Sequence, residues 1–249
     1  MIEETTYVYG KHAVKEVLTV RPQLVRTVHL APDFADEGIL DLIKQGKIAR
    51  ASFDPKKLPK GISPDAVHQG IIAQVEIGRL LIPYETFLKE LKVTNDTALI
   101  VLGEVQDPQN VGSIIRSAAA FGIRGILIPE HRQAPLSGAV IKVSAGMAFR
   151  VPLVQIGNVN HTLEDLKSKG FWTYGLEQSA SHSVAREGFE KPSVFIVGNE
   201  ADGIRAKTLE HCDIPLMIPM HARAESLNAA VATAIVLSHW SQKHPGALG

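Results

Sequence analysis

The sequence is poor in the features that mark secreted, metal-binding and membrane proteins. Its single cysteine, Cys212, excludes an intrachain disulfide and a zinc site made of several cysteines. No signal-peptide pattern stands at the amino terminus, and no apolar run approaches the ~20 residues that span a bilayer. We therefore expect a cytoplasmic protein with no membrane partner.

The common ligand-binding motifs are also missing. There is no G-x-G-x-x-G turn for a dinucleotide and no G-x-x-x-x-G-K-[ST] phosphate loop. The ten histidines form no H-x-x-x-H or H-E-x-x-H pair, so we expect no metal. Ser226 lies outside any G-x-S-x-G elbow, which disfavours serine-hydrolase chemistry.

Charge is balanced across the chain. The 26 lysines and arginines match the 26 aspartates and glutamates, so the formal net charge is +0. Any RNA or DNA contact must therefore come from a local basic patch. One stretch is either such a patch or a solvated lysine-rich surface, and it holds Lys44, Lys47, Arg50, Lys56, Lys57 and Lys60 against Asp54.

We expect an α/β protein with two domains joined by a linker, at residues 1–78, 79–96 and 97–249. The hydrophobic fraction of 45% is sufficient for a sizeable core. In the first domain, periodicity predicts helices at 10–20 and 34–45 and strands at 24–30, 48–53 and 70–75. The linker contains Pro83 and one short helical stretch.

The second domain alternates strands and helices. Predicted strands are 98–102, 125–128, 151–155, 172–176, 194–197 and 214–217, and predicted helices are 111–121, 136–143, 162–169, 206–211 and 227–240. The strands are nearly continuous apolar runs, which is typical of a parallel sheet covered on both faces. The last helix is apolar nearly all round, so it must be covered on more than one side, and a partner subunit could be one cover.

Three loops follow predicted strands of this sheet, and each has an ordinary and a functional interpretation. The first, LGEVQDPQNVGSIIRSAAAFG at 102–122, reads as a strand, a turn and a helix capped by Asn110 and ended by Gly122. Arg116 points away from the apolar face of that helix. The stretch is either a plain strand–turn–helix or an anion site made of a helix amino terminus and an arginine.

The other two loops are Gly-Asn-Glu-Ala-Asp-Gly-Ile at 198–204 and the segment 218–228, which ends in Ser226-Leu227-Asn228. Singly, these glycines and asparagines read as turn residues, with Ser226 as a helix cap and Asn228 in the first helical turn. Parallel α/β sheets bind ligands at the carboxyl ends of their strands. Three such loops in one domain therefore favour a site.

Together the loops resemble the SpoU/TrmH family of RNA ribose 2′-O-methyltransferases, within the knotted SPOUT superfamily. The similarity lies in VQDPQNVGSIIRSAAAFG, VFIVGNEADGI and IPM…ESLNAAVATA, and it spans residues 97–241. YGKHAVKEVL and HQGIIAQV resemble the ribosomal protein L30e-like RNA-binding extension of enzymes that methylate a guanosine of large-subunit ribosomal RNA. Where the family often has valine and a small residue after Ser-Leu-Asn, this chain has Ala229 and Ala230.

The resemblance implies a trefoil-knot domain, S-adenosylmethionine as cofactor, an RNA substrate and a homodimer formed through the knot domain. It implies functional roles for Asn110, Arg116, Glu200, Ser226 and Asn228. It implies cofactor contacts at Gly198, Asn199, Glu200, Ile218, Met220, Ser226 and Leu227.

The sequence leaves several alternatives open. The substrate could be transfer RNA instead of ribosomal RNA, and a self-protecting antibiotic-resistance enzyme would share this architecture. A catalytically silent RNA-binding or assembly factor on the same fold is the alternative from another class. A small-molecule α/β enzyme using another nucleotide is disfavoured by the missing phosphate-loop motifs. Arg116 could act in its own subunit or in its partner's.

Overall fold

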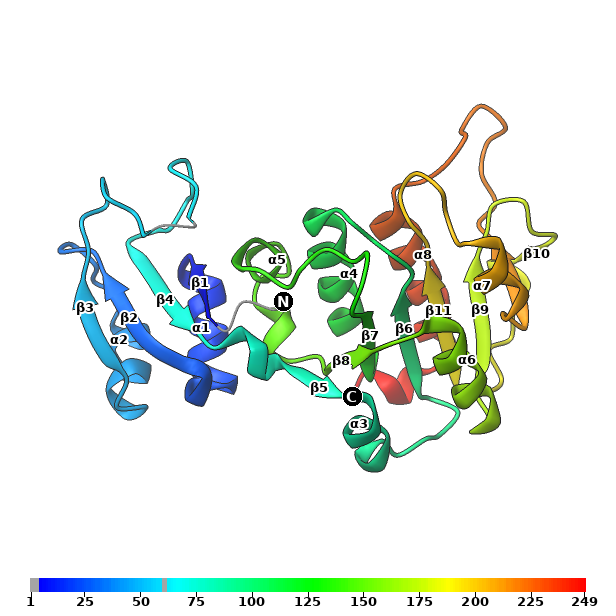
Figure 1. Ribbon diagram of the computed structural model, residues 1–249, viewed down its shortest axis with the longest axis horizontal. Coiled ribbons are helices and arrows are strands. Elements are labelled where there is room, and N and C mark those ends of the chain that lie inside the picture. Colours follow the sequence, from blue (N-terminus) through cyan, green and yellow to red (C-terminus); the bar gives the residue numbers. More distant parts are fainter. Residues whose placement is uncertain (1–4, 60–61) are drawn as a thin grey trace. The chain divides into compact units, whose positions relative to one another are not determined.

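The computed structural model describes residues 5–59 and 62–249, so the predicted RNA contact Lys60 lies outside the described residues. The chain divides into two compact units (Figure 1). The first contains residues up to 81 together with 135–150, and the second contains 82–134 and 151–249. No helix in the described ranges is long and apolar enough to cross a membrane.

The first unit is built on a four-stranded sheet in the order β1-β4-β2-β3. β2 and β3 run parallel, and β4 runs antiparallel to β1 and β2. The predicted elements are confirmed, whereas β1 was missed because four residues beside an acidic start give little periodicity. The elements are β1 (Thr6–Tyr9), α1 (Lys11–Val20), β2 (Val25–Leu30), α2 (Glu37–Gln45), β3 (Ala49–Ser52), β4 (Ile71–Val75) and α5 (Gly138–Val143).

Helix α5 joins this unit from far along the sequence. It packs against β1, and a Cβ on Gly138 would overlap the carbonyl oxygen of Tyr7. Arg150 donates from Nε to Glu16 of α1 at 2.6 Å. Segment 135–150 therefore belongs to the first unit's packing, although it lies inside the predicted second domain.

The second unit is built on an eight-stranded sheet in the order β10-β12-β9-β11-β6-β7-β8-β5. Strands β6 to β12 all run parallel, which confirms the predicted parallel sheet. Its strands are β5 (Leu81–Pro83), β6 (Ala98–Leu102), β7 (Gly125–Pro129), β8 (Leu153–Ile156), β9 (Trp172–Leu176), β10 (His182–Ser183), β11 (Ser193–Val197) and β12 (Ile214–Met217).

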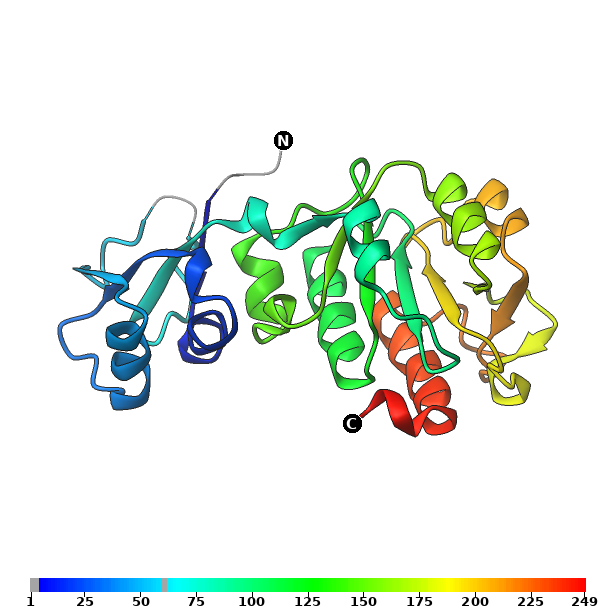
Figure 2. The ribbon, with the colours of Figure 1, turned by 90° about the horizontal axis from the view of Figure 1, so that it is seen from below.

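Helices cover both faces of this sheet (Figure 2). On one face lie α3 (Tyr84–Glu90), α6 (Val159–Ser168) and α7 (Ala206–Glu210), and on the other α4 (Pro108–Ala120) and α8 (Ala229–Lys243). The core under the first group joins sheet residues to helix residues, among them Leu99, Val101, Val194, Ile196, Phe87, Leu163 and Leu166. Because the strands are apolar and covered on both faces, polar functional side chains must come from the loops at the edge of the sheet.

The predicted linker is more than a tether. It holds the expected short helix, α3, but it also supplies edge strand β5, and Phe87 is buried in the second unit's core. Helix α4 ends as predicted, because Gly122 follows the last turn with a φ of 72° that suits glycine. Helix α8 buries Val236, Leu237 and Trp240, yet Val231 is 48% exposed, so this chain leaves part of its apolar surface uncovered.

Candidate active site

The three predicted loops meet at the carboxyl edge of the sheet in the second unit. They follow β6, β11 and β12, and the end of β9 joins them. The loops after β11 and β12, the end of β9 and the start of α8 surround a pocket of about 330 Å³, while the loop after β6 contributes no residue to its lining. Its walls are formed by Leu176, Glu177, Gln178, Val197, Gly198, Asn199, Glu200, Ala201, Asp202, Gly203, Leu216, Ile218, Met220, Ser226, Leu227, Ala229 and Ala232.

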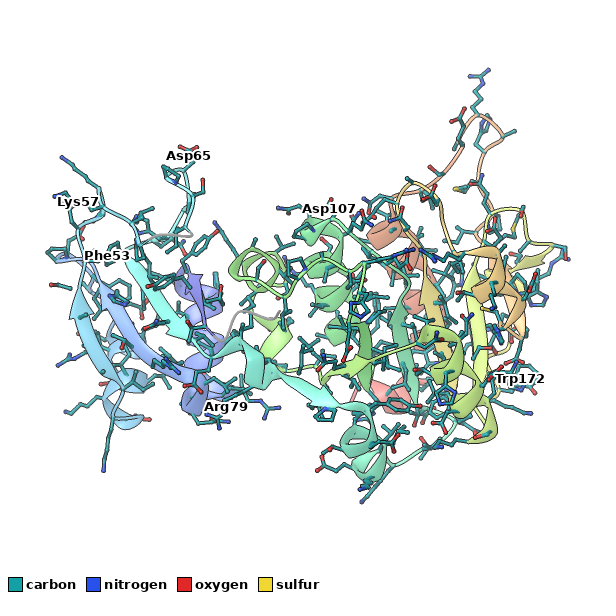
Figure 3. The ribbon with its side chains drawn as sticks, in the orientation of Figure 1. Phe53, Lys57, Asp65, Arg79, Asp107 and Trp172 are labelled. Atoms are coloured by element: carbon teal, nitrogen blue, oxygen red, sulfur yellow. The ribbon has the colours of Figure 1, made fainter. Side chains whose placement is uncertain are left out.

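The first loop begins α4 in a different way from that expected. Asp107, labelled in Figure 3, is the N-cap, and its carboxylate accepts from the backbone N–H of Gln109 at 2.8 Å. The prediction that Asn110 is the N-cap is therefore wrong. Pro108 occupies the first helical position, which favours the preceding residue as the cap. Asn110 instead lies in the first turn, 5% exposed, and its side chain turns toward the other two loops.

A hydrogen-bonded network of Glu200, Asn110 and Asn228 ties the three loops together. Asn110 donates from Nδ2 to Glu200 Oε1 at 2.9 Å and accepts at Oδ1 from Asn228 Nδ2 at 2.8 Å. Glu200 also accepts from the backbone N–H groups of Gln106, at 3.2 Å, and Asp107, at 3.1 Å. Asn110 thus uses both ends of its amide to connect the second loop to the third.

Asn228 is both the end of this network and the start of α8. Its Oδ1 accepts from the N–H groups of Ala230, at 2.9 Å, and Val231, at 3.2 Å. The prediction that Ser226 caps this helix is therefore wrong, because Asn228 takes the cap and the helix begins at Ala229. Ser226 therefore does not cap the helix, and it lines the pocket.

The network determines the charge state of Glu200. Burial raises the pKa of this carboxyl, but the hydrogen bonds from Asn110 and from the backbone of Asp107 and Gln106 outweigh it, so the pKa is lowered. Glu200 is therefore ionised at neutral pH. With three donors already on its oxygens, it is a structural acceptor and a poor base.

The second loop is held in shape by Asn199. Its backbone exchanges hydrogen bonds with Gly203 at 2.9 and 3.0 Å, and its Oδ1 accepts from Ala201 N–H at 2.8 Å. Its Nδ2 donates to the carbonyl of Glu104 at 2.9 Å, which connects this loop to the first. A Cβ on Gly198 would overlap the backbone of Gly203, so closing this turn requires a glycine there.

The predicted site residues divide into three groups. All seven predicted for cofactor contact line the pocket: Gly198, Asn199, Glu200, Ile218, Met220, Ser226 and Leu227. Asn110 and Asn228 do not line the pocket and instead belong to the hydrogen-bonded network that connects its loops. Arg116 is exposed on α4 outside the pocket lining and has no hydrogen bond or ion pair within residues 5–59 and 62–249.

Sequence reasoning missed one wall of the pocket. Leu176 ends β9, a parallel strand of the same sheet, and Glu177 and Gln178 follow it. The rule that ligands bind at the carboxyl ends of such strands would have identified them. No group of three or more metal-ligating side chains occurs in the described part of the chain.

The pocket suits a small organic ligand with both polar and apolar parts. Its volume lies within the ~300–1,000 Å³ of ligand pockets. Leu176, Leu216 and Met220 supply apolar wall, while the loop at 198–203 supplies backbone polar groups.

Comparison with known proteins identifies the family. A family model described as the SpoU rRNA methylase family matches residues 97–238, and one described as RNA 2′-O ribose methyltransferase substrate binding matches residues 7–80. The chain belongs to the SpoU rRNA methylase family. The resemblance read from the motifs is thereby confirmed.

Relatives within the SpoU family align over nearly the whole chain. The 23S rRNA (guanosine-2′-O-)-methyltransferase RlmB of Escherichia coli is 34% identical, with 92% of this chain and 95% of the relative covered. RlmB of Vibrio parahaemolyticus is 32% identical, with 93% and 94% covered.

Solved structures share the fold. The SpoU methyltransferase AviRb from Streptomyces viridochromogenes, in complex with AdoMet, gives a TM-score of 0.78 at 21% identity, covering 98% of this chain and 92% of AviRb. An AdoMet-bound rRNA methyltransferase from Sinorhizobium meliloti gives 0.77 at 20% identity, covering 96% and 87%.

The network predicts a pH-dependent contribution of Glu200 to stability. Glu200→Gln replaces an acceptor of three hydrogen bonds by a carboxamide, and it should lower the free energy of unfolding at pH 7 by about 1 kcal/mol. Because the folded pKa lies below the ordinary value of 4.5, this contribution is complete above that pH. It is lost as the pH falls through the folded pKa.

Urea unfolding followed by tryptophan fluorescence measures the effect, since both tryptophans, Trp172 and Trp240, lie in the second unit. Glu210→Gln, at an exposed glutamate of α7, is the matched control and should show no such difference. A gap between wild type and Glu200→Gln that stays constant down to pH 3 would contradict the assignment.

Proposed function

We propose that this protein transfers the methyl group of S-adenosylmethionine to a ribose 2′-hydroxyl of RNA, at a guanosine of 23S ribosomal RNA. The observation that carries the proposal is the pocket, which two of the SpoU-family loops line and which the Glu200–Asn110–Asn228 network connects to the third. The RlmB relatives, which match over more than nine-tenths of the chain, support the choice of RNA.

The pocket residues fit the cofactor. Leu176, Leu216 and Met220 would shelter its apolar parts, and the backbone at 198–203 and the hydroxyl of Ser226 offer hydrogen-bonding groups. When bound, S-adenosylmethionine supplies an electrophilic methyl group. The protein must then bring a hydroxyl oxygen into line with it and provide for the hydroxyl proton.

The residues at the site favour positioning over base catalysis. Glu200 already accepts three hydrogen bonds, and an arginine remains protonated with a pKa above ~12. Arg116, exposed and without a partner among the described residues, is suited to grip an RNA phosphate and orient the ribose. That phosphate would accept the proton. Asn110 and Asn228 would keep α4 and its arginine in place.

The finer architecture is also part of this proposal. We infer a trefoil knot in the methyltransferase domain at 97–249, with a linker at 79–96 and an L30e-like RNA-binding domain at 1–78. Val231 is an apolar residue that is exposed on the largely apolar helix α8, and this supports a homodimer formed through the helix. Lys56 and Lys57 are exposed and support RNA contact by the basic stretch. Action on ribosomal RNA would place the protein in the cytoplasm.

Methyl transfer from labelled S-adenosylmethionine tests the proposed function. Unmodified 23S rRNA and unmodified transfer RNA are offered separately, and the 2′-O-methyl position is mapped by resistance to alkaline cleavage. We expect methylation of one guanosine in 23S rRNA. Methylation of transfer RNA alone would overturn the choice of substrate, and cofactor binding without transfer to either RNA would indicate a silent factor.

Arg116→Ala tests the positioning mechanism in the same assay. Loss of the phosphate grip should lower kcat about 100-fold, while the affinity for S-adenosylmethionine stays unchanged, because Arg116 lies outside the pocket lining. Arg124→Ala, at another exposed arginine, is the matched control. Nearly normal turnover by Arg116→Ala would refute this role.

A further inference from the structure

A second pocket, of about 360 Å³, opens at the same carboxyl edge of the second unit's sheet. Gly103, Pro129 and Gly157 line it: Gly103 follows β6, Pro129 ends β7 and Gly157 follows β8. It also includes the first residues of α6 and α7, which cover the sheet face opposite α4 and α8 (Figure 2). The first pocket, by contrast, includes Ala229 and Ala232 of α8.

The second pocket is lined mainly by cationic and neutral polar side chains. Its ionisable groups are His131, Arg132, Arg205, Lys207 and Glu104. Glu104 is paired with Arg205, accepting at Oε2 from Nη2 at 2.9 Å and from Nε at 3.1 Å. Arg132 and Lys207 have no hydrogen bond or ion pair in the part of the chain that the structure describes. In a protein of net charge +0, the pocket therefore has a local excess of positive charge.

The backbone adds to this preference for an anion. Asn158 caps α6 by accepting from His161 N–H at 3.1 Å, which leaves the N–H groups of Val159 and Asn160 without helical partners. Val159 and Asn160 both line the pocket. A helix amino terminus beside two uncompensated cations binds phosphate readily.

The loop 103–107 couples this pocket to the first one. Glu104 lines the second pocket, and its carbonyl accepts from Asn199, which lines the first. Gln106 and Asp107 donate to Glu200. Gly203 lines one pocket and its neighbour Ile204 the other. The pockets thus share a wall, so a polyanionic strand crossing it could occupy both, whereas a free phosphate would occupy one.

We propose that the second pocket binds a backbone phosphate of the RNA substrate, near the nucleotide whose ribose reaches the first pocket. Arg132 and Lys207 supply the charge, and the start of α6 supplies the N–H donors. The proposal rests on the proposed function, since it takes RNA to be the ligand.

The experiment measures the binding of unmodified 23S rRNA to the full chain over a range of salt concentrations. Arg132→Ala combined with Lys207→Ala should weaken binding at least about tenfold and lower the slope of log affinity against log salt by about 1–2. Arg124→Ala is the matched control, because Arg124 precedes β7 whereas Arg132 follows it. The affinity for S-adenosylmethionine should stay within twofold.

A second variant fills the cavity without changing its charge. A Cβ at Gly157 would meet nothing within 4 Å, and the φ of this residue lies outside the left-handed region, so Gly157→Leu should fold normally and weaken RNA binding. If Gly157→Leu binds RNA as tightly as the wild type, the phosphate does not occupy the pocket, and the cations act as a diffuse surface charge instead. An unchanged salt slope in the double variant would overturn the site altogether.

Two further measurements separate the possible failures. Calorimetry with inorganic phosphate shows whether the site takes a free anion: phosphate binding that is lost in the double variant, with RNA binding intact, would overturn the RNA assignment. Methyl transfer by the wild type is scored independently. If the wild type binds RNA with the predicted salt dependence but transfers no methyl group, the proposed function fails and the phosphate site stands.

Discussion

A single buried amide, that of Asn110, joins the three loops at the carboxyl edge of the second unit's sheet. Asn110 donates to Glu200 and accepts from Asn228, so one side chain joins loops that follow three different strands. Because a hydrogen bond left unmade at a 95%-buried position would cost the full desolvation of the amide, each partner constrains the others. The pocket keeps its shape because the starts of α4 and α8 are locked to the loop at 198–204.

In this arrangement, the residues that hold the loops in place are largely different from the residues that line the pocket. The residues of the network use their polar atoms on one another, while the residues that line the pocket offer apolar surface and backbone groups. Glu200 does both, but its oxygens are occupied, and this argues against base catalysis by Glu200. Under the proposed function, Arg116 and the cations of the second pocket, Arg132 and Lys207, would contact the RNA backbone. A methyltransferase with such a site gains its rate chiefly from positioning.

Sequence reasoning located most of the sheet because its strands are buried on both faces. The predicted runs at 98–102, 172–176 and 214–217 match β6, β9 and β12 residue for residue. Short elements with little periodicity, such as β1 and β10, were missed. The assignment of α5 to the first unit depends on Gly138 meeting Tyr7, a contact that local pattern does not encode.

The helix caps show where local rules reach their limit. Asn110 and Ser226 are both good N-caps by residue type, yet Asp107 and Asn228 take those positions. Asn110 was available for tertiary bonds only because Asp107 precedes Pro108 and caps the helix first. The motif residues themselves were all found from sequence, whereas their connection through Asn110 depends on tertiary contacts that local pattern does not encode. The Glu104–Arg205 pair and the second pocket had no sequence signal.

Calorimetric titration of S-adenosylmethionine into wild type and Asn110→Ala tests the central claim most directly. Asn110 does not line the pocket, so any effect on affinity must pass through the network. We expect the dissociation constant to rise about tenfold or more in Asn110→Ala and to stay unchanged in Asn95→Ala, an exposed asparagine of the same unit. Equal affinity in wild type and Asn110→Ala would contradict the claim that this network builds the site.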